Sequence, residues 1–246
     1  MHAAKPPAEA TVTDGPWRPL VAAVAGAAIF FGLTAVVVAI PGVEPRGAHV
    51  ILKLALIVLV LVIAASRGRW RELGFRRAPL LRGWGKPYAI GCLVMVASTA
   101  VMIVIGASHP MASKLSLRQV ALEVWLLSSV AEELFVRGLV QHWCNPPGTT
   151  LEQQRDLRGP VIASALLFGA MHAPLIWRGA GVVGGLILVA TTTIVGYVAA
   201  SMRQRSGSVH PAIALHIAAN VCAIPGTMLG IALVWLLTGE LPALAR

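Results

Sequence analysis

The chain has 246 residues, of which 57% are hydrophobic and 12% charged, and its mean hydropathy is +0.77. These values exclude an ordinary soluble domain, in which about a quarter of the residues are charged. The formal net charge is +10, but the basic residues cluster at the ends of apolar runs. Because that pattern is typical of topology signals and of contact with anionic lipid headgroups, we expect an all-α membrane protein with the lipid bilayer as a partner and no nucleic acid.

The N-terminal stretch 1–16 is polar and contains prolines, so it is predicted to be a disordered cytoplasmic tail. The remainder, 17–246, is predicted to be a single transmembrane domain, a polytopic helical bundle. About 20 apolar residues are needed to cross the hydrocarbon core as a helix. Apolar runs predict about eight transmembrane helices, at 20–40, 48–65, 88–107, 117–143, 160–177, 182–202, 209–223 and 225–238.

Lysines and arginines in the short connections predict the orientation, because they are retained on the cytoplasmic side. The connection between the second and third spans is the most basic, so we place it in the cytoplasm. With eight spans both termini are then cytoplasmic, and the basic residues outside are only Arg46, Lys114, Arg118 and Arg178. The Ala-, Gly- and Arg-rich composition points to a bacterial inner membrane.

The span at 117–143 contains three ionisable residues in the sequence AEELFVRGLV, namely Glu132, Glu133 and Arg137. A charged side chain at the centre of a membrane helix costs about 2.5–3.5 kcal/mol, so these groups must face protein. Glu133 and Arg137 are four residues apart and share a helix face, which suits an ion pair. Glu132 points about 100° away and is left without that partner. A purely structural packing network of all three is the alternative.

Two further spans carry a histidine one helical turn from another polar or aromatic residue. Phe168 precedes His172 in LLFGAMHAP, and His216 precedes Asn220 in SVHPAIALHIAAN. At 1.5 Å per residue, Glu132, His172 and His216 lie about 16, about 18 and about 12 Å from the cytoplasmic side. A carboxylate and two imidazoles are thus predicted at a similar depth, which packing alone does not readily explain.

These motifs carry a family resemblance. EELFVR fits E-E-x-x-x-R, FGAMH fits F-x-x-x-H and HIAAN fits H-x-x-x-N. In this order the chain resembles the CAAX prenyl protease and bacteriocin-processing family of intramembrane proteases, also called CPBP, Rce1-like or Abi. The eight-span layout and RELGFRR before the third span are also similar, and the resemblance covers about residues 50–225.

The resemblance implies an intramembrane endopeptidase that cleaves a membrane-associated or lipidated peptide. By that resemblance, Glu132 is the glutamate that activates a water and His172 helps to hold it. His216 and Asn220 would stabilise the oxyanion, and the supporting residues would be Glu133, Arg137 and Phe168.

Metal use is left open by the residues. Glu132, His172 and His216 offer three ligands for a divalent metal such as zinc, with water in the fourth position. We favour a metal-free glutamate mechanism that requires no cofactor. Other protease classes are excluded, because H-E-x-x-H and G-x-S-x-G are absent and the only aspartates, Asp14 and Asp156, lie outside the expected spans.

Two interpretations from other functional classes compete with the peptidase. The first is a non-enzymatic membrane scaffold of the same fold, which keeps the buried charges as contacts between helices. The second is a small proton-coupled transporter, in which glutamate and histidine relay protons. A proteolysis assay separates the scaffold from the peptidase, and proton-coupled flux in liposomes identifies the transporter.

Overall fold

The computed structural model describes residues 15–78, 83–107 and 115–242, and no β-strand occurs within these ranges. The predicted tail at 1–16 therefore lies almost wholly outside the described residues. The long helices are α1 (Arg18–Val38), α2 (Pro45–Ser66), α3 (Gly85–Val104), α8 (Arg158–Ala170), α9 (Gly181–Ser206) and α10 (His210–Thr238). Short helices are α7 (Leu151–Arg155) and the 3₁₀ turn η4 (Ala173–Ile176). The described chain is all-α, as predicted.

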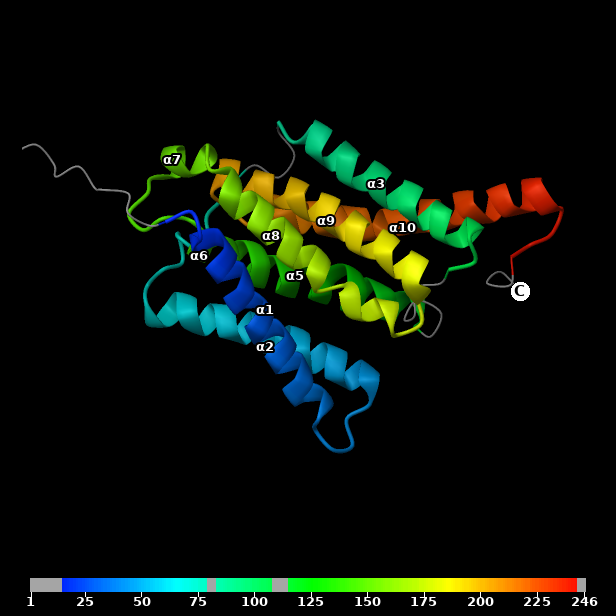
Figure 1. Ribbon diagram of the computed structural model, residues 1–246, viewed down its shortest axis with the longest axis horizontal. Coiled ribbons are helices and arrows are strands. Elements are labelled where there is room, and N and C mark those ends of the chain that lie inside the picture. Colours follow the sequence, from blue (N-terminus) through cyan, green and yellow to red (C-terminus); the bar gives the residue numbers. More distant parts are fainter. Residues whose placement is uncertain (1–14, 79–82, 108–114, 243–246) are drawn as a thin grey trace, which may run out of the picture.

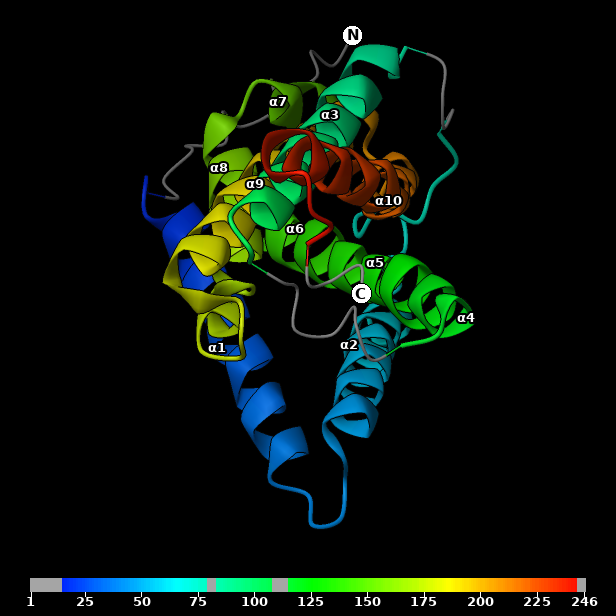
Figure 2. The same ribbon diagram turned by 90° about the vertical axis from the view of Figure 1, so that its right-hand side faces the viewer.

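One further helical run extends without a break from Leu117 to Cys144, and we call it the central helix. It consists of α4 (Leu117–Gln119), the π-helical η2 (Val120–Ser128), α5 (Ser129–Glu133), the π-helical η3 (Leu134–Val140) and α6 (Gln141–Cys144). Its α5 segment packs against α2 on one side and α10 on the other (Figures 1 and 2). π-Helical turns widen a helix and are frequent at functional sites. Since η2 and η3 flank α5, the α5 segment is a candidate part of a functional site.

Among the described residues, six helices are long and apolar enough to cross a membrane: α1, α2, α3, α8 with η4, α9 and α10. The prediction of separate spans at 209–223 and 225–238 is wrong, because α10 is one helix with Pro225 inside it. Proline is tolerated in a membrane helix, since neighbouring helices and local adjustments compensate for its missing N–H. The eight expected spans thus become these six helices and the central helix.

This count changes the expected topology. In Figure 1, α1 starts at the left end of the bundle and α10 ends at the right end. If the six apolar helices and the central helix all cross, the chain crosses an odd number of times. With seven crossings α1 would begin and α10 would end on opposite sides, whereas two cytoplasmic termini need an even number of crossings; the orientation stays a prediction.

The distribution of polarity is that of a membrane protein. Large apolar side chains such as Val24, Val58 and Leu93 are exposed on the outside of the bundle. Charged side chains, by contrast, lie inside it, among them Lys53, Glu132, Glu133, Arg137 and Arg203. Since a charge is stabilised in a bilayer only by facing protein or water, the functional chemistry must be sought in the interior.

Helices α3 and α10 pack closely along their length (Figures 1 and 2). Gly226 and Gly230 of α10 allow this approach: an added Cβ would lie 2.8 Å from the carbonyl oxygen of Val96 at the first position and 2.9 Å from that of Ala100 at the second. This is the small-residue spacing that brings membrane helices together. It anchors α10, which carries His216.

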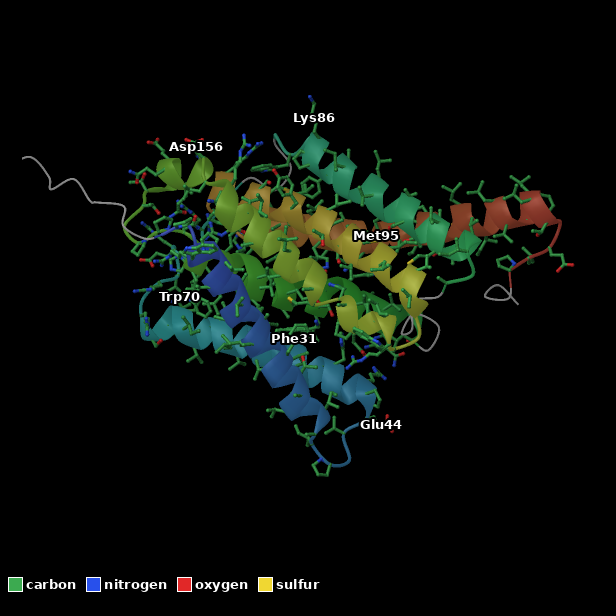
Figure 3. The ribbon with its side chains drawn as sticks, viewed as in Figure 1. Phe31, Glu44, Trp70, Lys86, Met95 and Asp156 are labelled. Carbon is green, nitrogen blue, oxygen red and sulfur yellow. The ribbon has the colours of Figure 1, made fainter. Side chains whose placement is uncertain are left out.

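The basic connection after α2 packs onto the turn between α9 and α10. The backbone N–H of Val209 donates to the carbonyl of Gly74 over 3.1 Å, and Arg76 Nε donates to the carbonyl of Gly207 over 2.9 Å. Gly74 has φ +90°, which a side chain would disfavour. Trp70 of this connection and Asp156 lie at the same end of the bundle (Figure 3).

Candidate active site

The two adjacent glutamates of the central helix are both buried, Glu132 at 6% exposure and Glu133 at 1%. Glu133 pairs with Arg137, whose Nη1 lies 3.1 Å from Oε1, as the four-residue spacing predicts. The guanidinium is not aligned to donate to this carboxylate, and Nη2 donates instead to the carbonyl of Gly196 on α9 over 2.9 Å. The pair is therefore electrostatic, and Arg137 also joins the central helix to α9.

Glu132, which lacks a partner on its own helix, is paired from α2. Lys53 Nζ donates to Glu132 Oε1 over 2.5 Å, and both side chains are buried. Lys53 is not among the site residues predicted from the sequence. Its signal was nevertheless present, because a lysine in the middle of an expected span is itself an intramembrane charge that needs a partner.

His216 of α10 lies between the two carboxylates. Its Nδ1 is 3.0 Å from Oε1 of Glu133, and because a carboxylate accepts here, Nδ1 carries the proton. Its Nε2 lies 4.0 Å from Oε2 of Glu132. That distance is too long for a hydrogen bond and fits one bridging water.

His172, the residue after α8 and Met171, completes this side of the site through Phe168. Its Nδ1 is 2.9 Å from the carbonyl of Phe168, which leaves Nε2 free. The Phe168 ring meets the His172 ring edge-on at 5.0 Å and the His216 ring at 5.3 Å. Arg137 stacks on the same ring, with Cζ 4.3 Å from its centroid. Phe168 is thus the common wall that orients both imidazoles.

Asn220 lies one turn further along α10 and contacts a different part of the central helix. Its Nδ2 donates to Ser129 Oγ over 3.1 Å. Ser129 is fully buried and precedes Glu132 by nearly one turn, and it is not among the site residues predicted from the sequence. Nδ2 also donates to the carbonyl of Val124 over 3.5 Å, so both N–H bonds of the amide have a partner on the central helix, and the second contact is the longer one.

The sequence separations of contacting residue pairs show whether each neighbouring helix runs parallel or antiparallel to the central helix. The α2 pairs His49–Ser128 and Lys53–Glu132 are both separated by 79 residues, so α2 runs parallel to the central helix. The α9 contacts Arg137–Gly196 and Gln141–Ala200 are both separated by 59, so α9 is also parallel. On α10 the order reverses, because His216 meets Glu133 whereas Asn220 meets Ser129.

The proposed ligand set Glu132, His172 and His216 is not assembled as a metal site. Within the described ranges, no three His, Cys, Asp or Glu side chains form a group able to hold a metal ion. One oxygen of Glu132 is held by the Lys53 ammonium, so a cation would have to share that carboxylate with an existing charge. The residues in this arrangement do not fit a three-ligand zinc centre.

The predicted residues thus lie together in one cluster inside the bundle, and a separate contact holds each side chain in place. Six are linked directly: Glu132, Glu133, Arg137, Phe168, His172 and His216. Asn220 adjoins the cluster through Ser129. Such a cluster offers a carboxylate, imidazole nitrogens and an amide donor around one buried position, which are the groups that water-dependent acyl chemistry requires.

Comparison with known proteins gives one family. Residues 114–222 match the family model described as type II CAAX prenyl endopeptidase Rce1-like, and this range contains all seven residues singled out from the motifs. No curated protein and no solved structure matches the chain. The match confirms the resemblance inferred from the motifs, and it implies a peptidase with a protein or peptide substrate. Over residues 114–222, this chain therefore carries a domain of the Rce1-like type II CAAX prenyl endopeptidase family.

Proposed function

We propose that this protein is an intramembrane endopeptidase that hydrolyses a peptide bond of a membrane-associated or lipidated substrate, with Glu132 as the general base. The observation that carries the proposal is the pairing across 4.0 Å of Glu132 Oε2 with His216 Nε2, inside a bundle whose outer surface is apolar. A water between these atoms would contact a base on one side and an imidazole on the other.

The reaction would then proceed by direct attack of that water. Glu132 Oε2 takes a proton while the water oxygen bonds to the carbonyl carbon of the substrate, and the electrons of the C=O bond move to its oxygen. When the C–N bond breaks, Glu132 returns the proton to the leaving amine. General base catalysis of this kind contributes about 10²- to 10⁴-fold.

The remaining residues have separate tasks in this proposal. His172 holds the water, and so does His216, because its Nε2 faces Glu132 Oε2; this differs from the oxyanion role that the resemblance implied for His216. Each imidazole is fixed through Nδ1, so Nε2 is available. Asn220 would offer a neutral N–H to the oxyanion by giving up its 3.5 Å contact with the carbonyl of Val124, while its shorter bond to Ser129 stays in place. Glu133, Arg137 and Phe168 support the imidazoles rather than touch the substrate.

The proposed orientation places the basic connection after α2 in the cytoplasm. At this end of the bundle lie α7 and the turn from α9 to α10 (Figure 1). The described basic residues there include Arg67, Arg69, Arg71, Arg155 and Arg205. Positive residues are retained on the cytoplasmic side, so this end of the bundle would lie at the anionic inner leaflet. The substrate would meet the protein in a bilayer with that orientation.

The test uses purified protein in lipid nanodiscs with a quenched fluorescent peptide that ends in a prenylated CaaX sequence, and with its unprenylated twin. We expect Glu132→Gln to lower turnover about 10²- to 10⁴-fold without loss of folding, because the amide preserves shape and removes the base. Glu44→Gln is the matched control, because Glu44 lies in the connection between α1 and α2, far from the cluster (Figure 3).

The test extends to natural substrates by comparing cells that carry the wild-type protein with cells that carry Glu132→Gln. Mass spectrometry identifies the peptide ends in the membranes of both. Turnover in Glu132→Gln above about a tenth of the wild-type rate would overturn the role of Glu132. Identical peptide ends in both cells and no cleavage in nanodiscs would favour the scaffold. Proton-driven flux in liposomes would favour the transporter.

A further inference from the structure

The structure assigns Lys53 as a positioning residue for Glu132: its ammonium group holds the carboxylate ionised inside the bundle and occupies Oε1, so that Oε2 is the oxygen available to the water. This inference rests on the proposed function of Glu132 as the base. Lys53 lies outside the range 114–222 that matches the family, so no comparison assigns it a role.

The first support is charge balance. Two adjacent carboxylates are buried in one helix, and Arg137 compensates only Glu133. A buried carboxylate without a partner is disfavoured in its ionised form and takes up a proton, and a protonated carboxyl group cannot act as a base. The Lys53 side chain, 4% exposed, supplies the missing positive charge from α2.

The second support is that Lys53 and His216 face different oxygens of the Glu132 carboxylate. Lys53 Nζ lies 2.5 Å from Oε1 of Glu132, whereas His216 Nε2 faces Oε2 at 4.0 Å. Because the carboxylate is planar, fixing one oxygen fixes the direction of the other. Lys53 therefore aims the free oxygen at the position where the imidazole can hold a water.

The third support is that Lys53 is itself held in register. One turn before it on α2, His49 Nε2 lies 3.0 Å from Ser128 Oγ, one turn before Glu132. Further towards the same end, Arg46 forms an ion pair with Glu123. The ring of Phe30 lies 5.9 Å from the ammonium on another side. These contacts align α2 with the central helix so that the ammonium meets one carboxylate.

The activity test compares Lys53→Met, Lys53→Arg and the control Lys86→Met in the nanodisc assay. Lys86 carries the same charge but projects away from the bundle (Figure 3). We expect Lys53→Met to lower kcat at least about 10-fold with KM unchanged within about 2-fold, because base function is lost while the substrate site is intact. Lys53→Arg should recover most of kcat, and Lys86→Met should behave as wild type.

The stability test does not depend on activity. Lys53→Met and Glu132→Gln should each lower the melting temperature in detergent, because each leaves one buried charge unpaired. The melting temperature of the double variant should fall by less than the sum of the two single decreases, since both charges are then absent. Additive losses would overturn the inference, as would a kcat in Lys53→Met equal to that of Lys86→Met, or a rise in KM alone. If Glu132→Gln remained active while the double variant showed coupling, the role of Glu132 as base would fail and the pairing would stand.

Discussion

At the scale of residues, each buried carboxylate of the site has a cation of its own. Glu133 has Arg137 on the same helix, and Glu132 has Lys53 on α2. His216 lies between the two carboxylates without replacing either cation. Because the charges are already compensated by side chains, an added metal ion is not needed to stabilise Glu132 in the ionised form.

This compensation leads to a prediction on metal dependence. Exhaustive chelation of the purified protein should leave peptidase activity unchanged. His172→Ala should lower turnover without changing the metal content, because in our proposal its imidazole holds water and is not a ligand. Metal analysis and activity measured on the same samples check both statements. About one zinc per chain, whose removal stops cleavage and whose return restores it, would contradict the prediction.

At the scale of elements, the central helix is positioned by polar contacts with α1, α2, α9 and α10. Helix α9 contributes an unusually close one at Gly196, whose carbonyl accepts from Arg137. A Cβ at this position would lie 2.9 Å from Arg137 Nη2 and 3.0 Å from Phe168 Cδ1. Both atoms belong to residues that support the imidazoles, so glycine is required for this packing.

We therefore predict that Gly196→Ala lowers both stability and activity. Over-packing of a filled interior costs about 1–3 kcal/mol, and here it would displace Arg137 and Phe168 together. The matched control is Gly32→Ala on α1, where an added Cβ meets nothing within 4 Å. Melting temperature and kcat of the two variants check the prediction. Equal behaviour of Gly196→Ala and Gly32→Ala would show that the space at Gly196 is not limiting.

At the scale of the whole molecule, the continuity of α10 determines the topology. As a single helix from His210 to Thr238, it carries the chain back across the bundle. Its first turn lies beside the basic connection after α2, and its last turn lies at the opposite end (Figure 1). Helix α10 thereby places His216 at the depth of Glu132 while moving the C-terminal end away from the start of α1.

The topology can be measured with single cysteines in a variant whose Cys92, Cys144 and Cys222 are replaced by alanine. If the six apolar helices and the central helix all cross, an impermeant thiol reagent added to intact cells should modify Leu241→Cys but not Gly15→Cys, because α10 would then end outside and α1 begin inside. Asp156→Cys, at the basic end of the bundle (Figure 3), should behave as Gly15→Cys. Equal labelling of Gly15→Cys and Leu241→Cys would instead support an even number of crossings.

The sequence predicted what depends on local spacing. The membrane class follows from composition, and the Glu133–Arg137 pair follows from a separation of four residues. The motif residues follow from their order along the chain, and all of them lie within the range 114–222 of the family match. The division of α10 into two predicted spans at Pro225 arose because proline breaks soluble helices but is tolerated where other helices surround it.

Tertiary structure alone decided which helix supplies each partner. Sequence left Glu132 unpaired and gave His216 no contact with Glu133, because the register between two helices is not encoded in the periodicity of either one. That register is set by close packing at positions such as Gly196 and Gly226 and by polar contacts such as His49 with Ser128. Side-chain volumes and hydrogen bonds summed over several helices fix the site, and no single segment contains that information.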